Sequence, residues 1–406
     1  MKIVDIKAYP IRLKNDLNES SSSDKKGKQK SDPSFGGESE RPPIKDLGDH
    51  FIDETNHTSI YSKFHQTTVV KVETSDGIIG WGEAQSPVSP NTTATIIKDL
   101  VYPLTINADI FDVEAIWNKN FTAMKERGHY TGFYIDAISG VDIAIWDAIG
   151  KTLKMPIHKL MGGRHRDMIK LYNGIGGRDP NKVAEMAQSS IAKGYKAVKL
   201  HLRENIEDTV KIVSKVRKVI GNDIDVMLDV HMMFNTYQAI RLGRQLEKFN
   251  IYWLEAPTDP NDIPGQIKIC RALDIPIANG EWTRTKFEMR EIFEKRAYDI
   301  SMPDIARTGL TGAKQIAAIA DLYNIPVAPH VGGGGILSVA ATVQFSIATP
   351  NFLIMEHSEQ GNKMKSQYLS HPFEPKNGAF PVTDKPGLGI DIDENSLQSF
   401  IAKPSL

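Results

Sequence analysis

Three acidic residues stand at the ends of successive apolar segments in the middle of the chain. Asp229 ends "MLD", Glu255 ends "WLE", and Glu281 follows "ANG". Both intervals are 26 residues (255 − 229 and 281 − 255), which is about one strand–helix unit of a parallel barrel. A single acid at a strand end is more often a helix cap or a salt-bridge partner. Three acids in register instead predict that the carboxylates meet at the mouth of a barrel.

Three converging carboxylates repel one another unless a cation neutralises them. Oxygen ligands without a cysteine among them favour a hard ion, Mg²⁺ ahead of Mn²⁺ or Ca²⁺. The sequence therefore predicts a Mg²⁺ cofactor held by Asp229, Glu255 and Glu281.

A second group of chemically capable residues lies further along, with Asp304 in "SMPDIA", His330 in "VAPHVG" and Glu356 in "LIMEHS". An Asp and a His on neighbouring strands can hydrogen-bond, which fixes the imidazole tautomer and raises its basicity. The glycine run 332–335 gives the backbone freedom beside this pair, and an ordinary flexible turn is the plainer interpretation. A phosphate cradle is less favoured, because the chain has no Walker A or dinucleotide fingerprint.

Two basic residues close the stretch "AVKLH", and a further histidine follows the first acid. Strand alternation aims Lys199 and His201 at one face, and turns His231 to the same side as Asp229. Plainer roles stay open. His201 can be a hydrogen-bonding partner of a substrate and His231 a histidine that orients a neighbouring ligand. Lys199 can neutralise a substrate carboxylate or lower the pKa of His201.

The elements that must position these residues alternate between strand and helix from Met168 onward. Strands spaced roughly 25 residues apart, with helices such as 181–194 and 310–324 between them, indicate a parallel sheet, and eight such units close as a barrel. The expected strands are 168–173, 196–201, 224–229, 251–255, 276–280, 298–302, 325–330 and 351–356.

The chain is expected to divide into three regions. Residues 1–130 form an α+β domain, residues 131–356 form the barrel, and residues 357–406 return to pack on the N-terminal domain. Apolar residues three and four apart predict a core helix over 134–153.

The N-terminal region carries strand signals that a polar insertion interrupts. Residues 1–14 alternate like a strand, and residues 65–84 are typical of a hairpin with its turn at 75–77. Residues 15–50 are rich in Ser, Lys, Gly and Pro, so we expect a long polar loop. This loop is either a flexible insertion or a lid over a site.

Composition limits the class of protein. In 406 residues, 49 Lys and Arg nearly balance 50 Asp and Glu, so no bulk field favours nucleic acid or an anionic membrane. The single Cys270 excludes an internal disulfide and indicates a reducing, cytoplasmic setting. No apolar run reaches the about 18 residues of a membrane helix, and the first residues do not resemble a signal peptide. A small molecule is the expected partner.

With these features together, the chain resembles the enolase superfamily and, within it, the mandelate racemase subgroup. The resemblance spans nearly the whole chain and implies a modified (β/α)₇β barrel with an α+β capping domain. It rests on the strand-end acids, the following "PD" and "PH", "GWGEA" (80–84), "AISGVDIAIWDAIGK" (137–151), the segment Pro156–Gly163 and "PGLG" (386–389).

The resemblance also implies roles for the residues singled out above. It places Mg²⁺ on the three strand-end acids and makes His330 and Asp304 an acid/base dyad. Glu356 is then expected beside the substrate carboxylate or the dyad. The subgroup further implies a symmetric homo-oligomer, either a dimer or an octamer.

One position departs from the subgroup pattern. Its members typically carry Lys-x-Lys at the end of the second barrel strand, and the second lysine is a base opposite the histidine dyad. Here the matching residues are Lys199, Leu200 and His201, so the usual lysine base is missing. In acid-sugar dehydratases of the subgroup, a histidine at the position of His231 serves as general acid.

The shared chemistry is removal of a proton α to a carboxylate, with the metal stabilising the enediolate. A racemase needs two bases, whereas a dehydratase needs one base and one acid. With His330 as base, His231 or His201 can protonate a departing hydroxyl, because an imidazolium donates readily near neutral pH. We therefore expect an aldonate dehydratase that forms a 2-keto-3-deoxy acid. Racemisation, epimerisation, cycloisomerisation or a non-catalytic binding role are the alternatives.

Substrate contacts are expected from loops rather than from the metal ligands. Arg127, His129 and Tyr130 precede the long helix, and Trp282 and Arg284 follow the third acid. Surface exposure or packing would explain each of these five residues equally well.

Overall fold

The N-terminal part of the chain builds an antiparallel sheet of three strands. The computed structural model describes residues 1–14, 45–53 and 57–402. The strands of this sheet are β1 (Ile3–Leu13), β5 (His65–Thr74) and β6 (Ile79–Ala84), in the order β1-β5-β6. The predicted hairpin is present, and its turn is closed by the Gly77 amide donating to the Thr74 carbonyl.

A second small sheet follows the polar insertion. Strands β2 (Lys45–Leu47), β3 (His50–Asp53) and β4 (Ser59–Ser62) pair antiparallel in that order. Residues 15–44 of the expected loop lie outside the described residues. Its last residues are not loop, since 45–47 and His50 belong to this sheet, where Asp46 faces Phe51.

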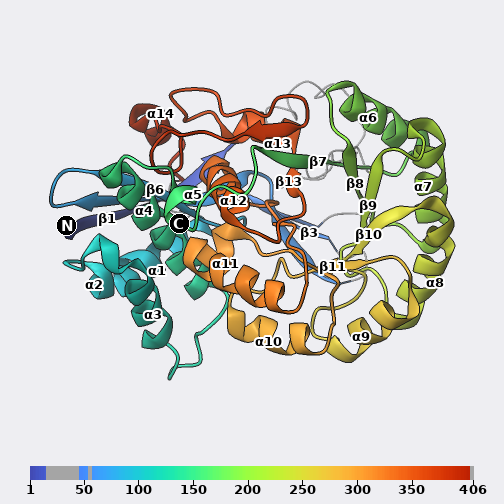
Figure 1. The fold of residues 1–406 in the computed structure, drawn as a ribbon, viewed down its shortest axis with the longest axis horizontal. Coiled ribbons are helices and arrows are strands. Elements are labelled where there is room, and N and C mark those ends of the chain that lie inside the picture. The colour runs from blue at the N-terminus through green and yellow to red at the C-terminus, as the bar shows by residue number, and fades with distance from the viewer. Residues whose placement is uncertain (15–44, 54–56, 403–406) are drawn as a thin grey trace.

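Helices cover the three-stranded sheet on the left of Figure 1, and the longest of them lies directly on it. Helix α4 confirms the helix expected at 134–153 and is buried over most of its length. The helices of this region are α1 (Pro90–Ile96), α2 (Tyr102–Thr105), α3 (Val113–Ala123) and α4 (Phe133–Leu153), followed by α5 (Ile157–Leu160).

The barrel occupies the right of Figure 1, where parallel strands stand inside a ring of helices. The sheet order is β12-β11-β10-β9-β8-β7-β13, so each strand pairs with its neighbour in the chain and β13 returns to β7. The strands are β7 (Met168–Gly176), β8 (Ala197–His201), β9 (Asp225–Asp229), β10 (Ile251–Glu255), β11 (Ile277–Asn279), β12 (Ile300–Ser301) and β13 (Met355–His357).

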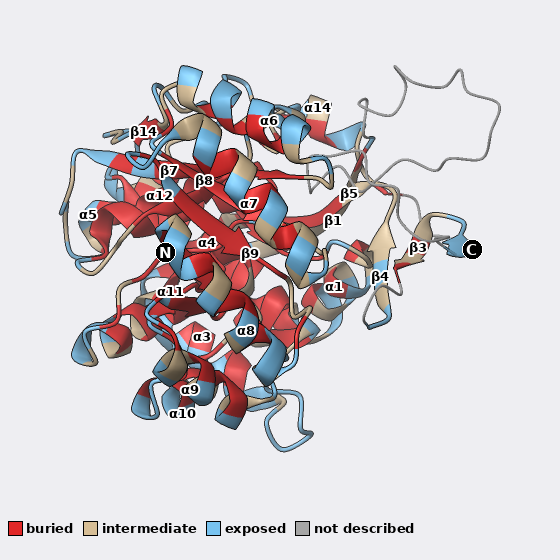
Figure 2. Ribbon diagram, turned by 90° about the vertical axis from the view of Figure 1, so that its right-hand side faces the viewer, coloured by how far each residue is buried: buried red, intermediate tan, exposed pale blue. Residues whose placement is uncertain are grey.

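Helices alternate with these strands, which confirms the modified barrel with an α+β capping domain. In Figure 2 the outer helices are banded, with buried inner and exposed outer faces, while the barrel strands are mostly buried. Amphipathic helices on a largely buried parallel sheet are typical of this architecture. The helices are α6 (Pro180–Ala192), α7 (Ile206–Ile220), α8 (Thr236–Leu246), α9 (Ile263–Ala272), α10 (Lys286–Glu294), α11 (Ile305–Leu322) and α12 (Ile336–Ala348).

One expected strand, 325–330, is not continuous. Only single bridges occur there, between Val327 and its neighbours on both sides and between His330 and Asp304. Pro326 and Pro329 lack an amide proton and therefore cannot donate to a ladder. The bridges still fill the gap between β12 and β13, so the prolines shorten the strand without opening the barrel.

After β13 the chain runs back to the N-terminal sheet. The amide of Arg12 donates to the Phe400 carbonyl and that of Ala402 to the Pro10 carbonyl. This segment contains α13 (Glu359–Lys365), β14 (Ala379–Pro381), which pairs with β7, and α14 (Glu394–Gln398). The domain boundaries drawn from the sequence stay predictions.

No helix among the described residues is long and apolar enough to cross a membrane.

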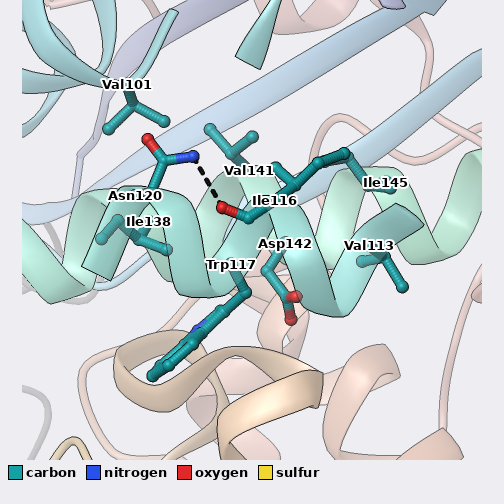
Figure 3. A pocket seen from close by; sticks show the side chains of 9 residues that line it. All are labelled: Val101, Val113, Ile116, Trp117, Asn120, Ile138, Val141, Asp142 and Ile145. Carbon is teal, nitrogen blue, oxygen red and sulfur yellow. Dashed lines mark hydrogen bonds between the residues drawn. The ribbon is translucent and has the colours of Figure 1, made fainter. Parts of the chain in front are cut away.

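A small cavity lies between α3 and α4 (Figure 3). Its volume is about 10 Å³, enough for about one water molecule at most. This cavity is therefore a packing feature rather than a substrate pocket. Its lining residues are Val101, Val113, Ile116, Trp117, Asn120, Ile138, Val141, Asp142 and Ile145.

The glycines of "GWGEA" allow α4 to lie against β6 at close range. A Cβ at Gly82 would overlap the Gly140 carbonyl oxygen, and one at Gly80 would overlap that of Ala144. Both obstacles are helix backbone, which cannot move aside as a flexible side chain can.

We predict that Gly82→Ala lowers the free energy of unfolding by about 1–3 kcal/mol, because it overpacks this contact. Urea unfolding followed by circular dichroism measures the change. Gly312→Ala in α11 is the matched control, since its nearest neighbours would lie 3.5–3.8 Å from the new Cβ and Ala is favoured over Gly in a helix by about 0.5–1 kcal/mol. Equal stability of the two variants would contradict the close-packing account.

Candidate active site

The strand register brings the predicted residues to one end of the barrel. His201 lies opposite Asp229, and Asp229 lies opposite Glu255, all at the carboxyl ends of parallel strands. Glu255 pairs with Ala278, and Glu281 follows after the turn at Gly280, whose φ is +124°. The three acids therefore surround one mouth, the place where chemistry collects in such barrels.

The backbone just beyond these acids is strained. His231 (φ +47°), Met232 (φ +59°) and Ala256 (φ +46°) are non-glycine residues in the left-handed region. Hydrogen bonds hold this conformation: the His231 amide donates to Asp229 Oδ1 at 2.9 Å, and the Met232 amide to the Ala256 carbonyl at 2.7 Å. Strain that its surroundings maintain in this way is typical of functional sites.

Lys199 lies at the centre of the acid cluster and is 0% exposed. Its Nζ is 2.9 Å from Glu255 Oε1, 2.8 Å from Glu356 Oε1 and 3.9 Å from Asp229 Oδ2. Burial disfavours the ammonium, but the attraction of Glu255 and Glu356 outweighs it and holds the pKa of Lys199 well above its ordinary value. In this structure Lys199 neutralises the protein's own acids.

His330 and Asp304 form the expected pair. His330 Nδ1 and Asp304 Oδ2 are 2.7 Å apart, and His330 Nε2 lies 2.7 Å from Glu281 Oε2 and 3.6 Å from Glu356 Oε2. Burial disfavours the imidazolium, but Glu281 and Glu356, with the Asp304 hydrogen bond, raise the pKa of His330 well above its ordinary value. The amide of Val331 donates to Glu356 Oε2 at 2.8 Å and fixes that carboxylate.

The three strand-end acids have unequal proton affinities. Burial, together with repulsion from Asp229, raises the pKa of Glu255 to about 8 despite the nearby Lys199. For Glu281, burial is outweighed by the charge and hydrogen bond of His330, which lower its pKa to about 2. Asp229 is also held well below its ordinary pKa, because His231, His201 and Lys199 outweigh its burial. Glu255 therefore takes up a proton first when no further cation is present.

His201 and His231 flank Asp229 at the opening. His201 Nδ1 is 3.1 Å and His231 Nε2 is 3.6 Å from Asp229 Oδ2, and the ring centroids are 6.1 Å apart. Burial lowers the pKa of His231 to about 4, so His231 is neutral at pH 7 in this structure. To act as a general acid, His231 must therefore first gain a proton. The sequence pattern alone did not indicate this requirement.

The predicted ligand set fits a hard divalent cation by its chemistry. All three acids are buried, and Glu281 Oε1 has no hydrogen-bond partner among the described residues. Lys199 and Trp253 occupy the two oxygens of Glu255. Buried, mutually repelling carboxylates with an unpartnered oxygen are the donors that Mg²⁺ prefers.

The structure shows no hydrogen bond or ion pair between the residues predicted to bind the substrate and the acid cluster, among the described residues. Arg284 forms an ion pair with Asp136 of α4 at 2.7 Å and donates to the Trp282 carbonyl, so its guanidinium links barrel and helix. Arg127, His129 and Tyr130 lie exposed between α3 and α4. Their roles stay predictions.

Sequence reasoning missed an ion pair that joins the small sheet to the barrel. Arg203 is 3.0 Å from Asp53 Oδ2, hydrogen-bonds to the Tyr61 hydroxyl and stacks over the Tyr61 ring at 5.4 Å. Arg203 continues the alternation of Lys199 and His201. This series of basic residues was the sequence signal that could have indicated a side chain at the barrel mouth. The contact places β3 and β4 beside the barrel mouth.

Sequence reasoning also missed the supports of the glycine run 332–335. The buried Glu83 carboxylate accepts from the amides of Gly335 and Ser338, and Lys365 Nζ donates to the Gly332 carbonyl at 3.1 Å. The run is thus held at both ends, against the plainer interpretation of a flexible turn. Glu83 belongs to "GWGEA", which was the signal in the sequence.

The structure combines a parallel barrel, acids and imidazoles at the barrel mouth, and an antiparallel capping sheet. This combination defines a class of barrel enzymes. Comparison with known proteins identifies the family. A family model described as "Enolase C-terminal domain-like" matches residues 182–396. The model for the N-terminal domain of mandelate racemase and muconate lactonizing enzyme matches residues 52–162. The chain belongs to the enolase superfamily, whose members use a divalent metal, typically Mg²⁺.

Curated relatives cover most of the chain. D-galactarolactone cycloisomerase of Agrobacterium fabrum is 32% identical, over 82% of this chain and 90% of the relative. Arabinonate dehydratase of Saccharolobus solfataricus is 29% identical, over 83% and 91%. D-xylonate dehydratase of Haloferax volcanii is 29% identical, over 89% and 94%. The named dehydratases are hydro-lyases.

Solved structures share the fold over nearly the whole chain. A putative isomerase from Sinorhizobium meliloti, in an open loop conformation, has a TM-score of 0.87 at 28% identity and covers 98% of both chains. The 3,6-anhydro-D-galactonate cycloisomerase of Zobellia galactanivorans has a TM-score of 0.81 at 28% identity, over 99% of this chain and 100% of its own.

We predict that Lys199→Met destabilises the metal-free protein by about 3–5 kcal/mol at pH 7, because the buried Glu255 and Glu356 lose the ammonium that lies 2.9 Å and 2.8 Å from them. Urea unfolding in EDTA measures the loss, and MgCl₂ should restore part of it. Lys193→Met is the control, because its ion pair with Glu359 is exposed and such pairs contribute about 0–1 kcal/mol. Equal losses in the two variants would refute the neutralising role of Lys199.

Proposed function

We propose that this protein is a Mg²⁺-dependent sugar-acid dehydratase that converts an aldonate to its 2-keto-3-deoxy acid. The observation that carries the proposal is the asymmetry of the mouth. One imidazole, His330, is oriented as a base by Asp304 at 2.7 Å. The amine of Lys199 is held by Glu255 and Glu356, and the position of the usual lysine base carries His201. Neither position therefore supplies the lysine that serves as the second base in the subgroup.

Asp229, Glu255 and Glu281 would hold the cation, which when bound supplies positive charge to the substrate carboxylate as its α-proton leaves. To act as the base, His330 must first lose the proton that Glu281 and Glu356 favour, and a cation held by Glu281 would offset that attraction. The neutral ring then takes the α-proton at Nε2, while Asp304 at Nδ1 keeps the ring oriented. Glu356, fixed by the Val331 amide, stabilises the imidazolium that forms.

The second half of the reaction needs an acid. The bond between the β-carbon and its hydroxyl breaks, and His231 or His201 donates the proton with which the hydroxyl leaves as water. The remaining enol takes a solvent proton at the β-carbon and becomes the ketone. Both histidines lie beside Asp229 and are partly exposed, 13% for His201 and 16% for His231, so a bound substrate can reach them.

Cycloisomerisation of a sugar-acid lactone is the second candidate, because the curated relative with 32% identity is named for it. It would begin with the same α-proton chemistry at His330. The two reactions differ in their products, since only dehydration releases water and forms a keto acid from an open-chain aldonate.

A small sugar acid is the proposed binding partner, and a homo-oligomer, dimeric or octameric, is the proposed assembly. The family resemblance supports the assembly. Sedimentation velocity measures it.

We predict that a screen of hexonates, pentonates and aldarates with MgCl₂ yields keto acid from at least some substrates, and that His330→Asn abolishes it by removing the base. Calorimetry should show that Mg²⁺ binding survives in this variant, because His330 is not a ligand. His371→Asn, an exposed histidine of the C-terminal segment, is the control. Wild-type turnover in His330→Asn, or inactivity of the wild type on the whole library, would overturn the proposal.

A further inference from the structure

A second group of potential metal ligands overlaps the acid cluster. Among the described residues, His201, Asp229 and His231 form a group in which one ligand atom of each lies within 4.8 Å of the others. The three strand-end acids do not form such a group among those residues. Glu255 instead contacts Lys199, and Glu281 contacts His330.

The separations in this group suit a borderline transition metal. Zn²⁺ binds imidazole nitrogen at about 2.0–2.1 Å and carboxylate oxygen at about 2.0–2.2 Å in tetrahedral sites, so neighbouring ligand atoms lie roughly 3.3 Å apart. Here the two nitrogens lie 3.1 Å and 3.6 Å from Asp229 Oδ2. Two of the three separations between ligand atoms are therefore close to those expected around one shared ion.

The donor types also distinguish this group from the acids. Two imidazoles and one carboxylate suit Zn²⁺, Co²⁺ or Ni²⁺, whereas a set made only of carboxylates suits Mg²⁺. The backbone holds the histidines in place, since His201 ends β8 opposite Asp229 and the left-handed turn at His231 and Met232 fixes the other. Both side chains are partly exposed, so an ion can enter from the barrel mouth.

We propose that His201, Asp229 and His231 form a second cation site, selective for Zn²⁺ and similar transition metals over Mg²⁺. The site shares Asp229 with the proposed Mg²⁺ ligands, so the two cations compete. Zn²⁺ also occupies both candidate proton donors. If the proposed dehydratase function holds, Zn²⁺ is therefore an inhibitor that excess Mg²⁺ relieves.

Calorimetric titration of ZnCl₂ into the metal-free full-length protein tests the site directly. We expect His201→Gln and His231→Gln each to weaken Zn²⁺ binding by about 100-fold or more, since even loss of a group behind a metal ligand costs about 10- to 100-fold. Both variants should keep wild-type Mg²⁺ affinity within a few-fold. Glu255→Gln should weaken Mg²⁺ binding and leave Zn²⁺ binding nearly unchanged. His371→Gln should change neither affinity.

Co²⁺ supplies a second readout that does not depend on activity. Its visible absorption reports imidazole ligation, so the wild-type spectrum should change in both histidine variants and stay unchanged in His371→Gln. Circular dichroism and thermal unfolding confirm that each variant folds.

Unchanged Zn²⁺ affinity and Co²⁺ spectra in both histidine variants would overturn the site, as would Zn²⁺ binding that Mg²⁺ does not displace at any concentration. Failure of the dehydratase proposal is distinguishable. In that case no sugar acid yields keto acid, while the metal affinities and spectra still depend on the two histidines.

Discussion

The mouth of this barrel depends on balancing buried negative charge. Asp229, Glu255, Glu281 and Glu356 lie within one small, buried region, where like charges repel strongly. Lys199 and His330 supply the opposing charge through contacts of 2.7–2.9 Å. Removing either cation leaves a buried carboxylate unpaired, which is far more costly than losing a pair at the surface.

This balance also explains the chemistry that we propose. A lysine committed to neutralising acids does not exchange protons with a substrate, so the mouth has one oriented base on one side. Its other side carries imidazoles. The cluster is held in place by the register of β8, β9 and β10 and by strained turns at the strand ends. Supports from outside the barrel, Glu83 and Arg203, complete the surroundings of the mouth.

Periodicity was sufficient to predict the barrel and the convergence of the acids, because a strand–helix repeat of constant length sets where each strand ends. It also predicted the contact between His330 and Asp304, which the structure contains. Local composition misled at 325–330, where an apolar stretch resembles a strand but two prolines interrupt its ladder. The polar insertion was similarly overextended, since its last residues pair in a small sheet.

Other features depend on partners that local patterns do not contain. Arg203 and Asp53 are 150 residues apart in the chain, and Arg284 is paired with Asp136, 148 residues away. Both pairs were therefore missed, and the expected contact of Arg284 with a substrate stays a prediction. The neutral state of His231 likewise follows from its burial, which no sequence motif reveals.

The most direct test of the account is to identify the product formed from an active sugar acid in ²H₂O with MgCl₂, by nuclear magnetic resonance. The account predicts a 2-keto-3-deoxy acid that carries one solvent deuterium at the former β-carbon, because the enol left by dehydration is protonated there. Deuterium exchange at the α-carbon without any keto acid would contradict it, because the α-proton would then be removed and replaced without loss of the β-hydroxyl.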